Sequence, residues 1–264
     1  MKTSIAKLAL GLTLVSMSSI AMAGIADTKH NLGSSPNAGN GGAGWNWTDG
    51  TTEICVFCHT PHGADSSAAV PLWNRNLSTQ ISSYNTYASL GTSTLDSAST
   101  TIGSVSLACL SCHDGTQAMN TVINSPGSGS TSDIGGTWVE FNQMSVGPVS
   151  TEMIYLSTDL RNDHPISIQY AGSVNGGPAN DGDFVAADSA TAASGTTVFY
   201  IETGGNATKS KTDLPLYNRV GGTLATQPLV ECATCHDPHT NTTTFLRNPA
   251  GNNGSATCLS CHAK

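Results

Sequence analysis

The sequence is poor in the residues from which a large enzyme core is built. Of its 264 residues, 38% are hydrophobic, 6% are aromatic and 11% are charged. Ser (32 residues), Thr (33) and Gly (28) make up about a third of the chain. Such a chain buries little apolar surface per residue, which argues against a core of packed helices and sheets. We therefore expect something other than side chains to fill the interior.

Basic residues are also scarce. The chain has 10 Lys and Arg against 18 Asp and Glu, a formal net charge of −8 at pH 7. Nucleic-acid binding requires clustered Lys and Arg to neutralise phosphates, so we expect no nucleic-acid partner. The acidic balance favours positively charged partners or surfaces.

Long apolar runs are absent after the N-terminus. Lys2 and Lys7 accompany an apolar run at 8–20, and Ala21-Met22-Ala23 has the small-x-small pattern of a cleavage site. The run is too short to span a bilayer comfortably. We therefore predict a signal peptide at residues 1–23, no membrane span, and a secreted protein that is extracellular or at the cell surface, with the periplasm as the alternative.

No cysteine is left outside one repeated motif. The eight cysteines form four C-x-x-C-H segments, which are Cys55, Cys58 and His59; Cys109, Cys112 and His113; Cys232, Cys235 and His236; and Cys258, Cys261 and His262. This is the signature of c-type haem attachment, in which two thiols bond to the porphyrin and the histidine is the proximal iron ligand. The pattern predicts four covalently attached haem c groups.

Three other uses of paired cysteines explain the motif less well. A disulfide framework does not require a His after each C-x-x-C. A zinc ribbon also leaves the repeated His unexplained. A thioredoxin-like redox motif would occur once, on a βαβ scaffold.

The histidines outside the motifs equal the motifs in number. They are His30, His62, His164 and His239. This count predicts bis-histidine coordination of every iron, which gives low-spin haems with no open position. Met119, Met144 and Met153 are the possible substitutes, although such methionines more often fill a core.

Two of these distal histidines follow a haem motif directly, in His59-Thr60-Pro61-His62 and His236-Asp237-Pro238-His239. A residue three positions after the proximal ligand cannot easily reach the opposite face of the same haem. We therefore expect His62 and His239 each to bind a different haem, which would clamp two haems together through a rigid Pro-containing segment.

The motifs form two pairs, each ending in C-L-S-C-H, which indicates an internal duplication. Pro71-Leu72-Trp73-Asn74-Arg75 has a weaker echo in Pro215-Leu216-Tyr217-Asn218-Arg219. We divide the chain after the signal peptide into a first di-haem segment (24–113), a central haem-wrapping segment (114–231) and a second di-haem segment (232–264).

The expected fold is mostly coil with few short helices and strands, organised around four covalent haems. Short helices carry the C-x-x-C-H motifs. Strands are predicted at 137–144, 153–157 and 196–202 from their β-branched and aromatic residues. A loop is predicted at 125–132 and turns at 172–183.

The paired motifs, Pro71-Leu72-Trp73-Asn74-Arg75 and Asn162-Asp163-His164-Pro165 resemble the doubled C-x-x-C-H multihaem cytochromes. Tetrahaem members of this kind, exported by metal-reducing bacteria, polymerise into extracellular cytochrome filaments. The resemblance implies four closely stacked bis-histidine haems, with one distal histidine donated by the neighbouring subunit.

His30 lies near the start of the predicted mature chain, on a segment rich in Gly and Asn, and the motif of His262 lies at the C-terminus. Our hypothesis is that His30 is donated to the His262 haem of an adjacent subunit, a contact that generates an open filament. Folding back onto its own chain is the alternative. For His164, Asp163 is expected to orient the imidazole.

The predicted function is electron transfer without substrate chemistry, by the subunit of an extracellular electron-conducting filament. Its partners would be further copies of itself, other cytochromes or extracellular electron acceptors. The alternatives are a monomeric periplasmic shuttle and a multihaem reductase, which requires one open iron.

Overall fold

The computed structural model of the chain describes residues 24–32, 53–77, 84–91, 93, 95, 97–98, 101–117, 121–125, 155–174, 176–205, 208–219 and 228–263. The predicted signal peptide, the three methionines, the strand at 137–144 and nearly all of the loop at 125–132 lie outside these residues.

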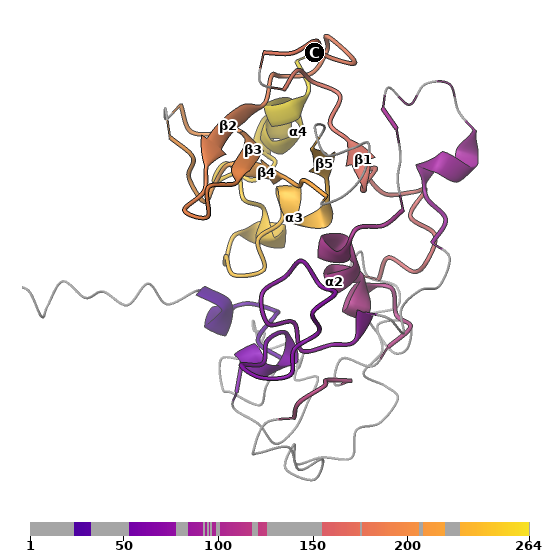
Figure 1. Ribbon diagram of the computed structural model, residues 1–264, viewed down its shortest axis with the longest axis vertical. Helices are drawn as coiled ribbons and strands as arrows, with labels where there is room; N and C mark the ends of the chain where they lie inside the picture. The colour runs from indigo at the N-terminus through magenta and orange to yellow at the C-terminus, as the bar shows by residue number, and fades with distance from the viewer. Residues whose placement is uncertain are drawn as a thin grey trace, which may run out of the picture.

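Loops and turns form most of the described chain, which confirms the prediction of a fold with little regular structure. The helices are α2 (Ser104–His113), α3 (Cys232–Cys235) and α4 (Ala256–Cys261) (Figure 1). Short 3-10 turns lie at Gly24–Asp27, Cys55–Phe57, Tyr87–Leu90, Thr243–Phe245 and Asn253–Ser255. The strands are β1 (Ile168–Gln169), β2 (Asp188–Thr191), β3 (Thr197–Ile201), β4 (Leu214–Leu216) and β5 (Leu229–Val230).

Helix α2 shows why helical periodicity is weak in this sequence. Its buried residues lie on several sides of the helix and include Val105, Ser106, Ala108, Leu110 and Ser111. A helix that is covered on several sides has no solvent-facing polar stripe, so its sequence shows no clear 3.6-residue period.

Strands β2, β3 and β4 form an antiparallel sheet in that order. The central strand β3 has the β-branched and aromatic residues that predicted a strand at 196–202, and this prediction is confirmed. The edge strands were not predicted, because β2 is polar and exposed and β4 contains Pro215. Proline is tolerated at a sheet edge, where a ladder hydrogen bond can be missing. Residues 155–157, in the predicted strand at 153–157, are not a strand.

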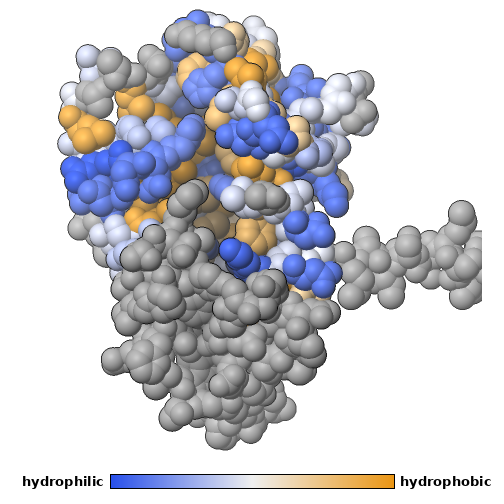
Figure 2. Space-filling view, turned by 180° about the vertical axis from the view of Figure 1, so that it is seen from behind, coloured by the Kyte–Doolittle hydropathy of each residue, from blue (hydrophilic) through white to orange (hydrophobic). Residues whose placement is uncertain are grey.

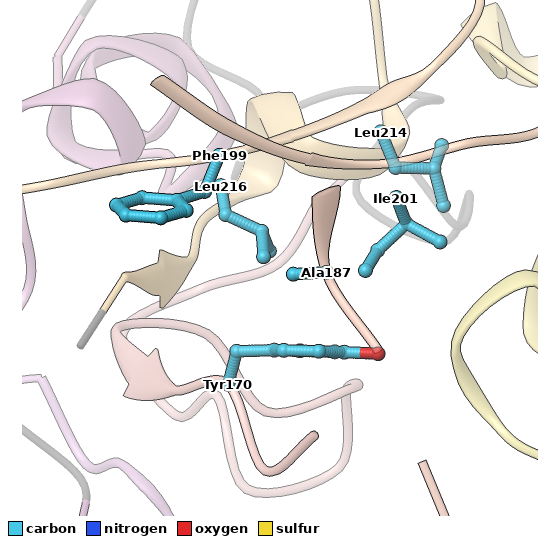
Figure 3. Close-up of a cluster of buried hydrophobic side chains, with 6 residues drawn as sticks. All are labelled: Tyr170, Ala187, Phe199, Ile201, Leu214 and Leu216. Atoms are coloured by element: carbon cyan, nitrogen blue, oxygen red, sulfur yellow. The ribbon is translucent and has the colours of Figure 1, made fainter. Parts of the chain in front are cut away.

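Side chains pack into small clusters, and each cluster contacts at least one cysteine of a C-x-x-C-H motif. The largest cluster has the sheet on one side and Cys261 at its margin (Figure 3); its buried members are Tyr170, Ala187, Phe199, Ile201, Leu214 and Leu216. A second cluster pairs Leu32 with Phe57 and touches Cys58 and Cys112, and a third, around Trp73, touches Cys58. In the described part of the chain, the side-chain core is therefore divided and gathers at the motifs.

Apolar surface remains open between these clusters. Hydrophobic patches lie between hydrophilic residues on the face shown in Figure 2. Leu259, which lies within the fourth C-x-x-C-H motif, is 50% exposed, and Leu72, whose carbonyl accepts from the N–H of Thr60 just after the first motif, is 53% exposed. This distribution agrees with the expectation that side chains alone do not complete the interior.

Among the described residues, the structure contains no helix with the length and apolar character needed to cross a membrane.

Replacing Ile201 by Ala removes a fully buried side chain from the largest cluster and leaves a cavity. We expect the free energy of unfolding to fall by about 2 to 5 kcal/mol, measured by guanidinium denaturation of the purified protein. Ser189→Ala, on the exposed strand β2, is the control and should change it by less than about 0.5 kcal/mol. Equal losses in the two variants would contradict a stabilising role for the cluster.

Candidate functional site

The first and third C-x-x-C-H motifs have the same local structure. In each, the histidine N–H donates to the carbonyl of the first cysteine, at 2.8 Å from His59 to Cys55 and 3.1 Å from His236 to Cys232. Each histidine then forms a β-bridge with a later segment, His59 with Trp73 and His236 with Leu246. The backbone thus holds each proximal histidine from both sides.

The two bridging segments also hold the histidine rings. Nδ1 of His59 lies 2.7 Å from the Pro71 carbonyl, and Nδ1 of His236 lies 2.8 Å from the Thr244 carbonyl. Both carbonyls belong to the residue two positions before the bridge partner. The left-handed backbone of Leu72 (φ 55°) and Phe245 (φ 59°) turns these carbonyls toward the rings.

Side chains that follow the bridges complete the correspondence. Asn74 donates from Nδ2 to the Val56 carbonyl at 2.6 Å, and Arg247 donates from Nε to the Ala233 carbonyl at 2.8 Å. Val56 and Ala233 occupy the same position in their motifs. The structural counterpart of Trp73-Asn74-Arg75 is therefore Leu246-Arg247-Asn248. The sequence echo at Leu216-Tyr217-Asn218-Arg219 is not this structural counterpart.

The same segments contact the second motif of each pair. Arg75 donates to the Ser111 carbonyl at 2.7 Å, and Asn248 donates to Oγ of Ser260 at 3.2 Å. Ser111 and Ser260 are the equivalent serines of the two C-L-S-C-H segments, which lie on α2 and α4. Each pair of motifs is thus built on one plan, in which the segment after the first motif supports the second.

Two pairs of histidines face each other across the fold. The ring centroids of His59 and His239 are 6.1 Å apart with the planes at 13°, and those of His30 and His113 are 6.1 Å apart at 79°. A metal–imidazole bond is about 2 Å long, so two imidazoles on opposite faces of one iron have centroids about 6 Å apart. Both pairs therefore have the separation that a single iron requires.

The ring of His30 packs against residues of its own chain. This is the alternative to donation of His30 to an adjacent subunit. Besides facing His113, its ring stacks on Phe245 with centroids 4.2 Å apart. Burial, followed by repulsion from His113, lowers the pKa of His30 to about 4. The imidazole is therefore neutral at pH 7, the form that binds a metal.

The ring of His164 contacts no other histidine ring among the described residues, but the charge of His262 acts on it. Partial burial and then the charge of His262 lower the pKa of His164, while Nδ1 lies 2.9 Å from the Pro165 carbonyl. The expectation that Asp163 orients this ring was wrong. Oδ2 of Asp163 is buried and has no hydrogen-bond partner among the described residues, and the pKa of this carboxyl is raised by burial and by Asp159.

His62 and His236 complete the set of eight. Among the described residues, neither ring contacts another histidine ring. His62 is exposed, and its carbonyl accepts hydrogen bonds from Thr60 at 3.1 Å and from Asn124 at 2.7 Å. Hydrogen bonds to the backbone thus hold the loop that carries His62, while the residue itself is exposed.

Several histidine rings are held through Nδ1. Backbone carbonyls contact Nδ1 of His30, His59, His164 and His236, and the Asp237 carboxylate lies 3.3 Å from Nδ1 of His239. Metal-binding histidines commonly donate their second ring N–H in this way, which fixes the tautomer and the ring orientation.

The cysteines bring successive motifs together. All eight are free. Burial and then the neighbouring Cys112 raise the pKa of Cys58 to about 12, so the first motif lies close to the second. The thiols of Cys109 and Cys232 shift each other's pKa, upward for Cys109 and downward for Cys232, so the second motif lies against the third. Burial and then the neighbouring Cys235 raise the pKa of Cys261 to about 12, so the third motif lies close to the fourth.

These features fit covalent haem better than the other uses of cysteine. Free thiols exclude a disulfide framework in this structure, and the described residues contain no group of three or more His, Cys, Asp or Glu side chains arranged to hold a bare metal ion. Beside His59, with ring centroids 6.1 Å apart, Trp73 has a buried indole N–H that finds no partner among the described residues. Such an N–H usually has an acceptor, and a haem propionate is a suitable one.

Comparison with known families gives one result for this chain. Residues 227–264 match the doubled CXXCH motif family, and this range covers the third and fourth motifs. No curated protein matches the chain. The match supports the resemblance stated from the sequence for this pair of motifs. It identifies a site of covalent c-type haem attachment, with the electron-transfer function that such haems serve.

Replacing both Cys258 and Cys261 by Ala should lower the mass of the denatured chain by one haem, because thioether bonds survive denaturation. Mass spectrometry and haem staining after denaturing electrophoresis measure this change. Ser260→Ala, which lies between the two cysteines and keeps both thiols, is the matched control. An unchanged mass in the double variant would contradict haem attachment at this motif.

Proposed function

We propose that this protein is a tetrahaem c-type cytochrome that carries electrons along four bis-histidine haems and catalyses no reaction of its own. The observation that carries the proposal is the 6.1 Å centroid separation in two histidine pairs from distant parts of the chain. A bound haem would take up and release one electron at its iron. The chain's own residues attach the haem, hold its ligands and exclude water.

The eight histidines then divide into four ligand pairs. His59 pairs with His239 and His113 with His30, on their ring separations. His262 pairs with His164, on the electrostatic effect between them. Among the described residues, His236 then remains as a proximal ligand whose ring faces no histidine ring. Because His239 follows the third motif but serves the first haem, the segment His236-Asp237-Pro238-His239 would link two haems, as the pattern predicts.

The contacts between cysteines support a continuous path. These contacts bring the first motif close to the second, the second close to the third and the third close to the fourth. Since each cysteine marks the edge of a haem, neighbouring cysteines bring neighbouring haem edges together. Electrons could therefore pass along the haems in sequence order.

The ring planes yield a spectroscopic test of these pairs. The orientation of two axial imidazoles sets the splitting of the iron d orbitals, so the parallel pair (13°) and the perpendicular pair (79°) should give different low-spin signals. We expect His30→Ala to abolish a highly anisotropic signal and His239→Ala to abolish a rhombic one, each with a new high-spin haem, in electron paramagnetic resonance.

Asn241→Ala, an exposed substitution two residues from His239, is the control and should leave both signals. Retention of every low-spin signal in His30→Ala and His239→Ala would contradict the two ligand pairs.

The remaining two histidines point to assembly. His62 is exposed, and the ring of His236 faces no other histidine ring among the described residues. In the proposal, His62 of one subunit supplies the distal ligand to the His236 haem of the next. His30, whose ring faces His113, is no longer needed as the donor. A contact between two different surfaces of the same chain propagates as an open filament, which agrees with a filament subunit outside the cell.

The ring of His236, unpaired among the described residues, also leads to the main alternative function, a multihaem reductase. In a single chain, the iron at His236 would have an open position, which a multihaem reductase requires and an electron shuttle does not. In the filament, His62 of the next subunit would fill the open position on this iron. In the reductase, the position would stay open.

His62→Ala should disperse the filaments and convert one haem per chain from low spin to high spin. Electron microscopy of the exported protein and optical spectroscopy of the same sample measure the two effects. Ser66→Ala, an exposed substitution on the same loop, should change neither. Filaments that persist in His62→Ala contradict donation by His62, and a wild-type protein with one high-spin haem in dispersed monomers would favour the reductase.

A further inference from the structure

A buried carboxylate lies where the two pairs of motifs meet. Glu231 is 2% exposed and precedes Cys232 at the start of α3. Its Oε2 accepts hydrogen bonds from Ser106 of α2 and from Ser167, the latter at 2.9 Å. Its Oε1 forms an ion pair with Arg219 at 2.9 Å. One side chain thus joins α2, α3 and two segments of the central region.

The other members of this cluster are bonded to each other and to the helix ends. Oγ of Ser106 accepts from the N–H of Cys232 at 3.1 Å, and Oγ of Ser167 accepts from the N–H of Gly103 at 3.0 Å. Arg219 also donates to the Thr101 carbonyl at 2.6 Å. The first residues of α2 and of α3 are therefore held by one polar network.

Gly103 shows how closely the network is packed. A Cβ at this position would overlap Oε1 of Glu231 and would lie 2.7 Å from the Arg219 guanidinium. The glycine precedes α2 and leaves the carboxylate room to reach the helix start.

A C-x-x-C-H motif does not need such a residue. Glu231 caps α3 together with Thr234, whereas the equivalent position before the first motif is Ile54, which makes no side-chain cap. Both motifs form the same local structure. The carboxylate is therefore a feature of the junction and not of haem attachment in general.

The junction is where the second and third motifs touch. Helix α2 packs against α3, as Figure 1 shows, and Oγ of Ser106 on α2 accepts a hydrogen bond from the N–H of Cys232 on α3. Ser106 lies one helical turn before Cys109, and Glu231 is next to Cys232. A change in the network would move the two cysteines relative to each other.

We propose that Glu231 is the positioning residue that sets the separation of the second and third haems, and with Arg219 keeps the charge beside them balanced. This inference rests on the proposed tetrahaem function. It makes Glu231 the link through which electrons cross from the first di-haem segment to the second, although the residue touches no haem ligand ring.

Two variants test the positioning role of Glu231 and its charge separately. Glu231→Ala removes the link, and the exciton couplet of the haem Soret band in circular dichroism should lose at least half of its amplitude. Glu231→Gln keeps the shape and should preserve the couplet. Because Arg219 then has no countercharge, the reduction equilibrium of one haem should shift about tenfold toward the reduced form, about 59 mV for one electron.

Glu202→Ala and Glu202→Gln are the matched controls, since Glu202 is partly exposed and follows β3. Each variant is first tested for haem content after denaturation. Wild-type chains without covalent haem would overturn the proposed function itself. Haem-loaded Glu231→Gln with wild-type potentials, or haem-loaded Glu231→Ala with a wild-type couplet, would overturn the role of Glu231 alone. If Glu231→Ala does not mature, the potentials of Glu231→Gln decide the question.

Discussion

The C-x-x-C-H motif imposes the constraint on which the rest of the structure depends. It places two thiols and an imidazole on one short turn of backbone, held by a hydrogen bond from the histidine N–H to the first cysteine. The side-chain clusters are small, and each ends on motif cysteines. A chain with so little apolar surface needs a covalently held hydrophobic group to complete such clusters. Long loops and short strands then suffice to connect the motifs.

The second constraint is the orientation of imidazoles. Carbonyl groups and one carboxylate contact Nδ1 in several rings, which fixes how each ring is oriented. The two facing pairs join residues far apart in the chain, His30 with His113 and His59 with His239. A bound iron would make each pair a long-range tie. The junction at Glu231 adds a third tie made only of protein atoms.

Some features of the site were accessible to sequence reasoning because they are local. The eight motif cysteines and the eight histidines follow from spacing and count, and β3 follows from its composition. The correspondence of Trp73 with Leu246 was not accessible. Trp73 follows His59 by 14 residues, Leu246 follows His236 by 10, and the two segments differ in side chain. What they share is a backbone bridge and a left-handed turn, which few sequence signals mark. The role expected of Asp163 failed because the Pro165 carbonyl already occupies Nδ1 of His164.

The sequence by itself determined the chemistry of each attachment point and the scarcity of ordinary core, because covalent motifs and composition do not depend on the fold. Only the tertiary structure decided which histidines face each other, that His62 and His236 have no such partner among the described residues, and that Glu231 joins the two halves. These relations depend on distances between segments that are up to about two hundred residues apart, and no local spacing specifies where a loop-rich chain returns upon itself.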